Sequence, residues 1–123
     1  MKRALLMLAA SFLQLSGALA QVPCQAKIDL AWHDQLLILT GRCRSLLDQP
    51  VRYNYQMVVL RQSQVGRSQN HQSGEFTLPA QQAVVLTEVR LNTSHQDVYL
   101  ARLVIFDLNG HTIAQDSVRQ SWP

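Results

Sequence analysis

The amino-acid sequence predicts an all-β protein, a seven-stranded immunoglobulin-like β-sandwich. After the first twenty residues, short runs of alternating apolar and polar residues follow one another, with turn-forming residues between them. No helical periodicity persists through that part of the sequence. The 123 residues suffice for one domain with one modest core. Seven short strands in a chain of this size are typical of an immunoglobulin-like sandwich.

The first twenty residues have the form of a cleavable export signal. Two basic residues precede an apolar run, residues 4–15, that is shorter than the roughly 20 residues that a membrane-spanning helix needs. Residues 18–20 are Ala-Leu-Ala, which suits a signal peptidase. We therefore expect cleavage before Gln21, a single domain over residues 21–123 and no membrane insertion. An uncleaved N-terminal anchor is the alternative.

Loss of the signal changes the charge of the chain. Nine Lys and Arg residues then remain against eight Asp and Glu residues, a net charge of +1 instead of +3. This balance is too even to favour a nucleic-acid partner. Lys27 is the only lysine left, and the other positive charges are arginines, which bind carboxylates in two-pronged fashion and stack on flat groups. They indicate a recognition surface, or alternatively arginines that only solvate sheet edges and outer faces.

Residues 24–43 predict a β-hairpin. Its apolar face consists of Ala26, Ile28, Leu30 and Trp32 on one strand and Leu37, Leu39 and Gly41 on the other. If the chain reverses at residues 33–34, the pairs are Leu30 with Leu37 and Ile28 with Leu39, and Cys24 lies opposite Cys43. Directly opposed cysteines are close enough for a disulfide, which persists in an oxidising compartment and would contribute about 3 kcal/mol. A redox-active dithiol is the alternative, although the Cys-x-x-Cys spacing is missing.

The third and fourth strands differ sharply in polarity. The third, Val51 to about Arg61, should turn one face to the core, namely Tyr53, Tyr55, Met57 and Val59. Its other face carries Arg52, Asn54, Gln56, Val58 and Leu60. Gly66 then turns the chain into a polar fourth strand, roughly Ser68 to Leu78, which Pro79 ends because it has no N–H to donate. We expect Phe76 and Leu78 to be its buried anchors.

The remaining strands follow the same alternation. The fifth, Ala83–Leu91, should point Val85, Val89 and Leu91 inward and Glu88 and Arg90 outward, and a loop follows over residues 92–96. The sixth strand spans Asp97–Asp107 and the seventh runs from His111 to about Gln120. Asn109-Gly110 joins them, a strong hairpin signal because both residues accept positive φ.

The sixth strand is apolar on both faces. Tyr99, Ala101, Leu103 and Ile105 can fill the core, which leaves Val98, Leu100, Val104 and Phe106 around Arg102 on the outside. An outer face with this much apolar area and an embedded arginine favours a contact surface. The alternative is a central strand partly covered by a neighbouring loop.

Several segments occur in a distinctive order. They are Gly66 to Gln69 (GRSQ), Gln72 to Ala80 (QSGEFTLPA), Val84 to Asn92 and the closing Trp122-Pro123. In this order and spacing the chain resembles the curli-assembly proteins CsgC and CsgH, periplasmic factors of Gram-negative bacteria, from about Cys43 onward. The enterobacterial branch carries Cys-x-Cys at the region that matches Cys43. Here Arg44 and Ser45 follow, which puts a thiol role in doubt and moves the likeness toward CsgH.

The resemblance implies a periplasmic protein that keeps curlin subunits soluble and prevents premature amyloid assembly, without enzymatic activity or cofactor and as a monomer. Arginines on a sheet face would steer an acidic client and resist incorporation into a growing edge. From strand parity, the expected client-binding residues are Arg61, Arg67, Gln69, Gln72, Arg90 and Arg102. A thiol-redox partner and a structural or adhesion subunit of a surface fibre remain as alternative functions.

Catalysis and metal binding find little support in the sequence. The four histidines, His33, His71, His95 and His111, lie in turns or in the polar strand and have no ligand spacing. Ser94, His95 and Asp97 are neighbours in one loop, where the geometry of a catalytic triad is out of reach. We expect no catalytic residue, no metal and no cofactor.

Overall fold

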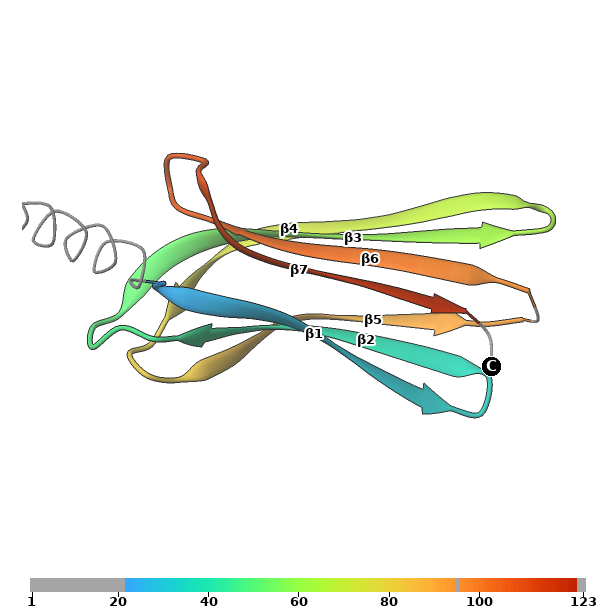
Figure 1. Cartoon of the computed structure of the whole chain (residues 1–123), viewed down its shortest axis with the longest axis horizontal. Coiled ribbons are helices and arrows are strands. Elements are labelled where there is room, and N and C mark those ends of the chain that lie inside the picture. Colours follow the sequence, from blue (N-terminus) through green and yellow to red (C-terminus); the bar gives the residue numbers. More distant parts are fainter. Residues whose placement is uncertain (1–21, 95, 122–123) are drawn as a thin grey trace, which may run out of the picture.

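The computed structural model describes residues 22–94 and 96–121. Seven strands form two antiparallel sheets that lie face to face (Figure 1). The strands are β1 (Cys24–His33), β2 (Leu36–Ser45), β3 (Val51–Ser63), β4 (Gly66–Leu78), β5 (Ala83–Asn92), β6 (Val98–Phe106) and β7 (Thr112–Ser121). One sheet has the order β1-β2-β5 and the other the order β4-β3-β6-β7. The predicted seven-stranded sandwich is confirmed, whereas the export signal lies outside the described residues.

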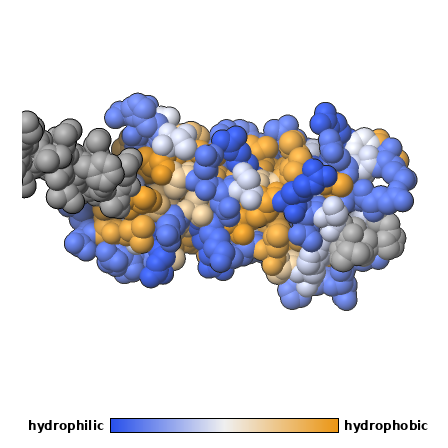
Figure 2. Space-filling model, viewed as in Figure 1, coloured by the Kyte–Doolittle hydropathy of each residue, from blue (hydrophilic) through white to orange (hydrophobic). Residues whose placement is uncertain are grey.

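The core lies between the two sheets. Leu37, Met57, Leu103 and Ile105 have no exposed surface, because the alternation of apolar residues points each of them inward. On the face seen in Figure 2, apolar side chains (orange) form patches along the middle of the molecule, with hydrophilic side chains (blue) between and around them. The core-facing residues predicted for the sixth strand are all buried, which confirms that part of the pattern.

The first hairpin forms as predicted but in another register. The chain turns at Asp34-Gln35, where Asp34 adopts a left-handed backbone with φ of 55°. Cys24 consequently pairs with Ser45, and Cys43 with Ala26. The predicted opposition of the two cysteines is wrong by two residues. Because side chains alternate with a period of two, this shift moves no residue to the other face, and the predicted apolar face survives.

The two cysteines are free thiols in the structure, so the predicted Cys24–Cys43 disulfide is not formed. Their diagonal positions across β1 and β2 explain the difference from the directly opposed pair. Both side chains are buried, with at most 1 % of their surface exposed. The hydrogen bond between the two thiols lowers the pKa of Cys24, while the same hydrogen bond and burial raise the pKa of Cys43. Cys43 is therefore protonated at neutral pH.

A β-bulge in β5 changes which of its residues face the core. Thr87 pairs with Gly41 and Val85 with Arg42, so β5 has one residue more than β2 at this point. The predicted inward position of Val85 is therefore wrong, since its side chain is 55 % exposed. Leu86 and Val84 pack against the core instead, while the inward predictions for Val89 and Leu91 are confirmed. A Cβ at Gly41 would lie 3.2 Å from the Met57 sulfur, which explains the glycine beside the bulge.

The polar strand β4 is held to the sandwich at one end. Leu78 is buried, and Phe76 contacts two tyrosines of β3, with ring centroids 6.1 Å from those of Tyr53 and Tyr55. The two predicted anchors thus lie where expected, Leu78 fully and Phe76 partly buried. The β6–β7 hairpin also forms at the predicted place, although only Gly110 of its two turn residues has a positive φ, of 89°.

Candidate functional site on the outer face of the four-stranded sheet

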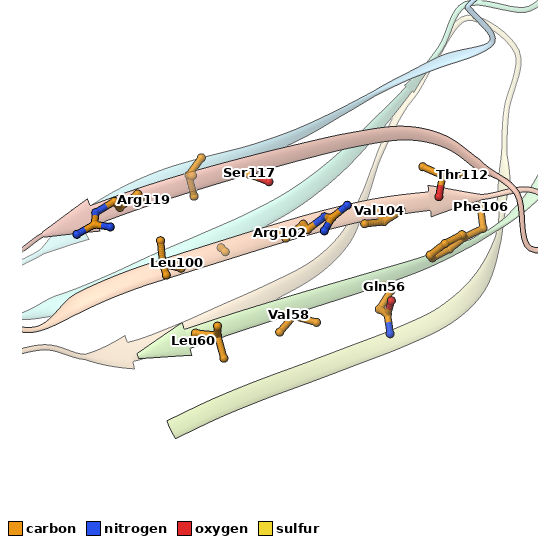
Figure 3. Close-up of a pocket in the computed structure, with 12 residues that line it drawn as sticks. Gln56, Val58, Leu60, Leu100, Arg102, Val104, Phe106, Thr112, Ser117 and Arg119 are labelled. Carbon is orange, nitrogen blue, oxygen red and sulfur yellow. The ribbon is translucent and has the colours of Figure 1, made fainter. Parts of the chain in front are cut away.

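The register of the four-stranded sheet assembles the outer-facing residues into rows. One row crosses from Gln69 through Leu60 and Leu100 to Arg119, because these residues are successive cross-strand partners. The next rows are His71–Val58–Arg102–Ser117 and Ser73–Gln56–Val104–Gln115. Figure 3 shows the side chains of β3, β6 and β7 in these rows projecting from one side of the sheet. We call this surface the outer face.

A groove with an apolar floor runs along the outer face. Most of its apolar lining comes from β3 and β6, and its main members are Val58, Leu60, Leu100, Val104 and Phe106. Its volume is about 670 Å³, and the sheet forms only one side of it, so it is open to solvent. The apolar outer face predicted for the sixth strand is therefore present, and β3 extends it. An open apolar groove of this size is typical of an interaction site.

The outer face carries arginines that make no ion pair within the described part of the chain, and two of them line the groove. Among the described residues, ion pairs engage five Lys and Arg side chains, which are Lys27, Arg42, Arg52, Arg61 and Arg90. Of the four arginines that make no ion pair among the described residues, Arg67, Arg102 and Arg119 lie on the outer face and Arg44 lies on the other sheet. The strands place a single carboxylate, Glu75, on the outer face, and Arg52 pairs with it. The outer face therefore carries uncompensated positive charge.

Arg102 occupies the middle of the groove. Its Nη2 donates a hydrogen bond of 2.7 Å to Oε1 of Gln115 on β7, which lies one row along the sheet. The neighbouring row holds Arg119, which pairs with Leu100 across the strands. Because the guanidinium group stays charged at any physiological pH, both arginines offer donors to a carboxylate at the border of an apolar surface.

The six residues predicted as one client-binding surface do not share a face. Arg67, Gln69 and Arg102 lie on the outer face. Gln72 pairs with Met57 and so lies on the inner side of β4. Arg90 lies on the outside of the other sheet, where its Nε donates to Oε1 of Glu88 at 2.8 Å. The predicted grouping is wrong for two reasons: Gln69 and Gln72 are three residues apart on one strand and so face opposite sides, and Arg90 lies on a strand of the other sheet.

Arg61 belongs to a buried polar cluster. Its Nε and Nη2 donate to Oδ2 of Asp97 at 3.0 and 2.7 Å, and Asp97 is only 2 % exposed. The same oxygen accepts hydrogen bonds from Ser94 N, Ser94 Oγ and Tyr99 OH. Arg61 thus faces the inside of the sandwich and holds the end of β3 to the loop before β6.

The ionisation of this cluster follows from its contacts. Burial alone would raise the pKa of Asp97, but the hydrogen bonds from Arg61, Ser94 and Tyr99 outweigh burial and hold that pKa below its ordinary value. Burial and the hydrogen bond to Asp97 raise the pKa of Tyr99 to about 12. The carboxylate is therefore ionised and the phenol protonated at neutral pH, as the hydrogen bonds require.

Arg119 is the residue of the outer face that the sequence interpretation missed. It lies on β7, where a register shift between Ile105 and Phe106 sets its row. The sequence shows that Arg119 and Ser117 face the same side of β7, but it does not show the pairing that brings Arg119 beside Leu100. The seventh strand was therefore predicted, whereas the position of Arg119 at the groove was not.

No group of three or more His, Cys, Asp or Glu side chains able to hold a metal ion occurs among residues 22–94 and 96–121. In the same part of the chain, Ser94 Oγ donates to Asp97 Oδ2, while His95 lies outside the described residues. Among the described residues there is no helix long and apolar enough to cross a membrane.

Solved structures with the same fold include two curli proteins. The E. coli curli protein CsgC is 23 % identical, with a TM-score of 0.64 over 81 % of this chain and 98 % of that one. R. palustris CsgH is 26 % identical, with a TM-score of 0.58 over 75 % of this chain and 89 % of that one. A putative β-galactosidase from Bacteroides fragilis, 11 % identical with a TM-score of 0.58, is matched over 81 % of this chain and 18 % of its own, and shares the fold alone.

Of the two curli proteins, CsgH is the more similar in sequence and CsgC in structure. No curated protein sequence matches the chain. The sequence model described as "Thin aggregative fimbriae synthesis protein" matches residues 18–115, which is most of the chain. The chain therefore belongs to the Tafi-CsgC family of curli-assembly proteins.

Proposed function

We propose that this protein binds curlin-type amyloid subunits in the periplasm and keeps them soluble until they are exported, acting as a monomer without chemical catalysis. The observation that carries the proposal is the outer face, where Arg102 and Arg119 line an apolar groove and no carboxylate of the sheet neutralises them. Family membership supports a role in curli assembly.

The charges of the outer face would act before contact. An unfolded client with exposed carboxylates is attracted over roughly 10 Å at an ionic strength of 0.1 M, which raises the rate of encounter. Arg102 and Arg119 would then hold a carboxylate beside the apolar floor of the groove. The ion pairs on the other sheet, such as Arg42 with Asp29, leave less free charge there. The outer face would therefore be the side that meets the client.

The apolar floor would act after contact. Leu60, Leu100 and Phe106 present half-buried apolar surface that a client's apolar side chain can cover. Covering such a side chain removes it from the contacts between subunits that make an amyloid nucleus. Because the groove is open and shallow, we expect the complex to be short-lived. A short-lived complex would let one molecule act on many clients in turn.

The test is a fibrillation time course of purified curlin with this protein at substoichiometric ratios. The wild type should lengthen the lag phase. The double variant Arg102→Glu, Arg119→Glu removes both groove arginines and reverses their charge, and should lower the rate of client capture about tenfold. It should therefore lose most of the delay.

A matched control is available on the opposite sheet. Arg44→Glu with Arg90→Glu makes the same change in net charge, at two exposed arginines on the outside of β2 and β5. This control should retain the delay. Equal loss in both double variants would show that net charge, and not the outer face, is responsible. Full inhibition by the groove variant, with an unchanged melting temperature, would remove the proposal.

A further inference from the structure

Four strands have a free edge, and three of these edges are blunted. Ile28 N of β1 is capped by Oδ2 of Asp116 at 2.8 Å. Strand β5 contains the bulge at Leu86, and β7 carries a register shift opposite Ile105 and Phe106. Bulges and caps of this kind are how proteins prevent an extra strand from adding to a sheet.

The fourth edge, that of β4, is long and regular. All thirteen residues of β4 pair with β3 without a shift in register. The strand lies at the end of its sheet in the order β4-β3-β6-β7, so its other side has no hydrogen-bonded neighbour (Figure 1). Alternate residues of an edge strand point both backbone N–H and C=O toward that free side.

The first half of this edge is polar on both faces. Residues 66–71 are all exposed, and so both faces of the strand are wet there. Arg67, Gln69 and His71 lie on one side and Ser68 and Asn70 on the other. A strand added beside them would place its own side chains next to polar groups on both faces, so an apolar strand would not fit. Gln, Asn and Ser would fit, because their side chains form hydrogen-bonded ladders between neighbouring strands.

The charge on the edge indicates what the added strand carries. Glu75 is already paired with Arg52, whereas Arg67 makes no ion pair among the described residues. The edge therefore has one uncompensated positive charge and is complementary to a strand with a carboxylate near Arg67. A second copy of this chain is a poorer match, because the only carboxylate of its own β4 is the engaged Glu75.

We propose that the free edge of β4 pairs, backbone to backbone, with an extended client strand that is rich in Gln, Asn and Ser and carries a carboxylate opposite Arg67. This inference rests on the proposed function and adds a second contact to it, distinct from the groove. Since β3 already occupies the other side of β4, the added strand would be covered on one edge by a folded protein. No further client strand could then pair on that side, so an amyloid stack could not grow in that direction.

The edge-facing amides follow from the turn. Residues 64–65 form a two-residue turn, and we take Ser63–Gly66 as its hydrogen-bonded closing pair. Counting from this pair, the residues that point their amides to the free side are Arg67, Gln69, His71 and Ser73. Hydrogen exchange of these four amides, measured by NMR on the mature protein with purified monomeric curlin, therefore reports on the edge directly.

The expected result is slower exchange, by about tenfold or more, at these four amides when curlin is added. Retained inhibition of fibrillation with no slowing at these amides would overturn the inference and leave the proposed function standing. Loss of both would overturn the two together. Slowing that appears without curlin and grows with protein concentration, with a dimer in sedimentation, would assign the edge to a second copy and overturn the inference.

Two peptides test the chemistry of the added strand. Both are nine-residue Gln/Asn/Ser sequences, one with a central Glu and one with Lys at the same position. The Glu peptide should slow exchange at the β4 amides, and the Lys peptide should do so several-fold less. Arg67→Gln should erase the difference between the two peptides while Arg44→Gln, on the other sheet, preserves it. Equal effects of the peptides on the wild type would contradict the assigned carboxylate.

Discussion

Replacement of Asp97 by alanine tests whether Arg61 serves the fold or the client. Oδ2 of Asp97 accepts hydrogen bonds from Arg61, Ser94 and Tyr99, over distances of 2.7 to 3.2 Å. Alanine removes this shared acceptor and leaves the donors behind in a site where the carboxylate was 2 % exposed. The cost of the change should therefore appear in the free energy of unfolding.

The magnitude follows from the burial of each partner. Breaking a fully buried ion pair costs about 3–5 kcal/mol, chiefly because the remaining charge is desolvated. The side chain of Arg61 is 32 % exposed and can recover some hydration, which places the expected loss near the lower end, at about 3 kcal/mol. For a domain of about 100 residues, this loss corresponds to a fall in melting temperature of about 15 °C.

The assay is urea and thermal unfolding followed by circular dichroism. Asp29→Ala is the matched control, since Asp29 also pairs with an arginine but is 39 % exposed and should cost less than about 1 kcal/mol. If the Asp97→Ala variant unfolded within about 1 kcal/mol of the wild type, the carboxylate would not hold the end of the sandwich together. Arg61 would then be available to the client, as the sequence interpretation supposed.

Three further predictions concern pH, salt and the thiols. The pKa of Asp97 is depressed in the folded state, so the stability that this carboxylate contributes is present above its unfolded pKa of about 4 and is lost as the pH falls through the lower folded value. The difference in melting temperature between the wild type and Asp97→Ala should therefore narrow in acid. A constant difference from pH 7 to pH 2 would contradict this prediction. Inhibition of curlin fibrillation should weaken from about 0.1 M to about 1 M salt, as the screening length falls from about 10 to about 3 Å, with Arg102→Glu, Arg119→Glu less affected than the wild type; unchanged inhibition would argue for apolar contact alone. Cys24 and Cys43 are buried, so a thiol reagent should label them only after unfolding. The variant Cys43→Ser should still inhibit fibrillation. Rapid labelling of the native protein, or loss of inhibition in a folded Cys43→Ser variant, would support the thiol-redox function instead.

Alternation along the strands made most of the fold predictable. Tyr53, Met57 and Val59 occur at odd positions of β3 among polar or half-exposed neighbours, and each is buried as expected. The errors arose where a local count changed. A turn one residue further on shifted the pairing by two residues and re-paired Cys24, and one extra residue in β5 turned Val85 outward. Both depend on how two strands pair, which no single strand encodes.

The candidate site was predictable only in part. An apolar outer side of the sixth strand, with Arg102 within it, could be seen from the sequence alone and lies in the groove. Its neighbours could not be foreseen, because a sheet places side by side residues as distant in the sequence as Gln69 and Arg119. Conversely, two arginines that were predicted to share a surface lie far from the groove. Arg61 belongs to the buried cluster with Asp97, and Arg90 lies on the opposite sheet.

The sequence by itself determined the class of this protein: seven strands around one core, and the order of segments from which the resemblance to CsgC and CsgH was predicted. These properties are local, since they follow from the period of two and from turn residues. The tertiary structure alone decided which arginines are neutralised, which edge is left open and where apolar surface meets free charge. Those properties depend on strand order and register, and thus on pairings between residues far apart in the chain.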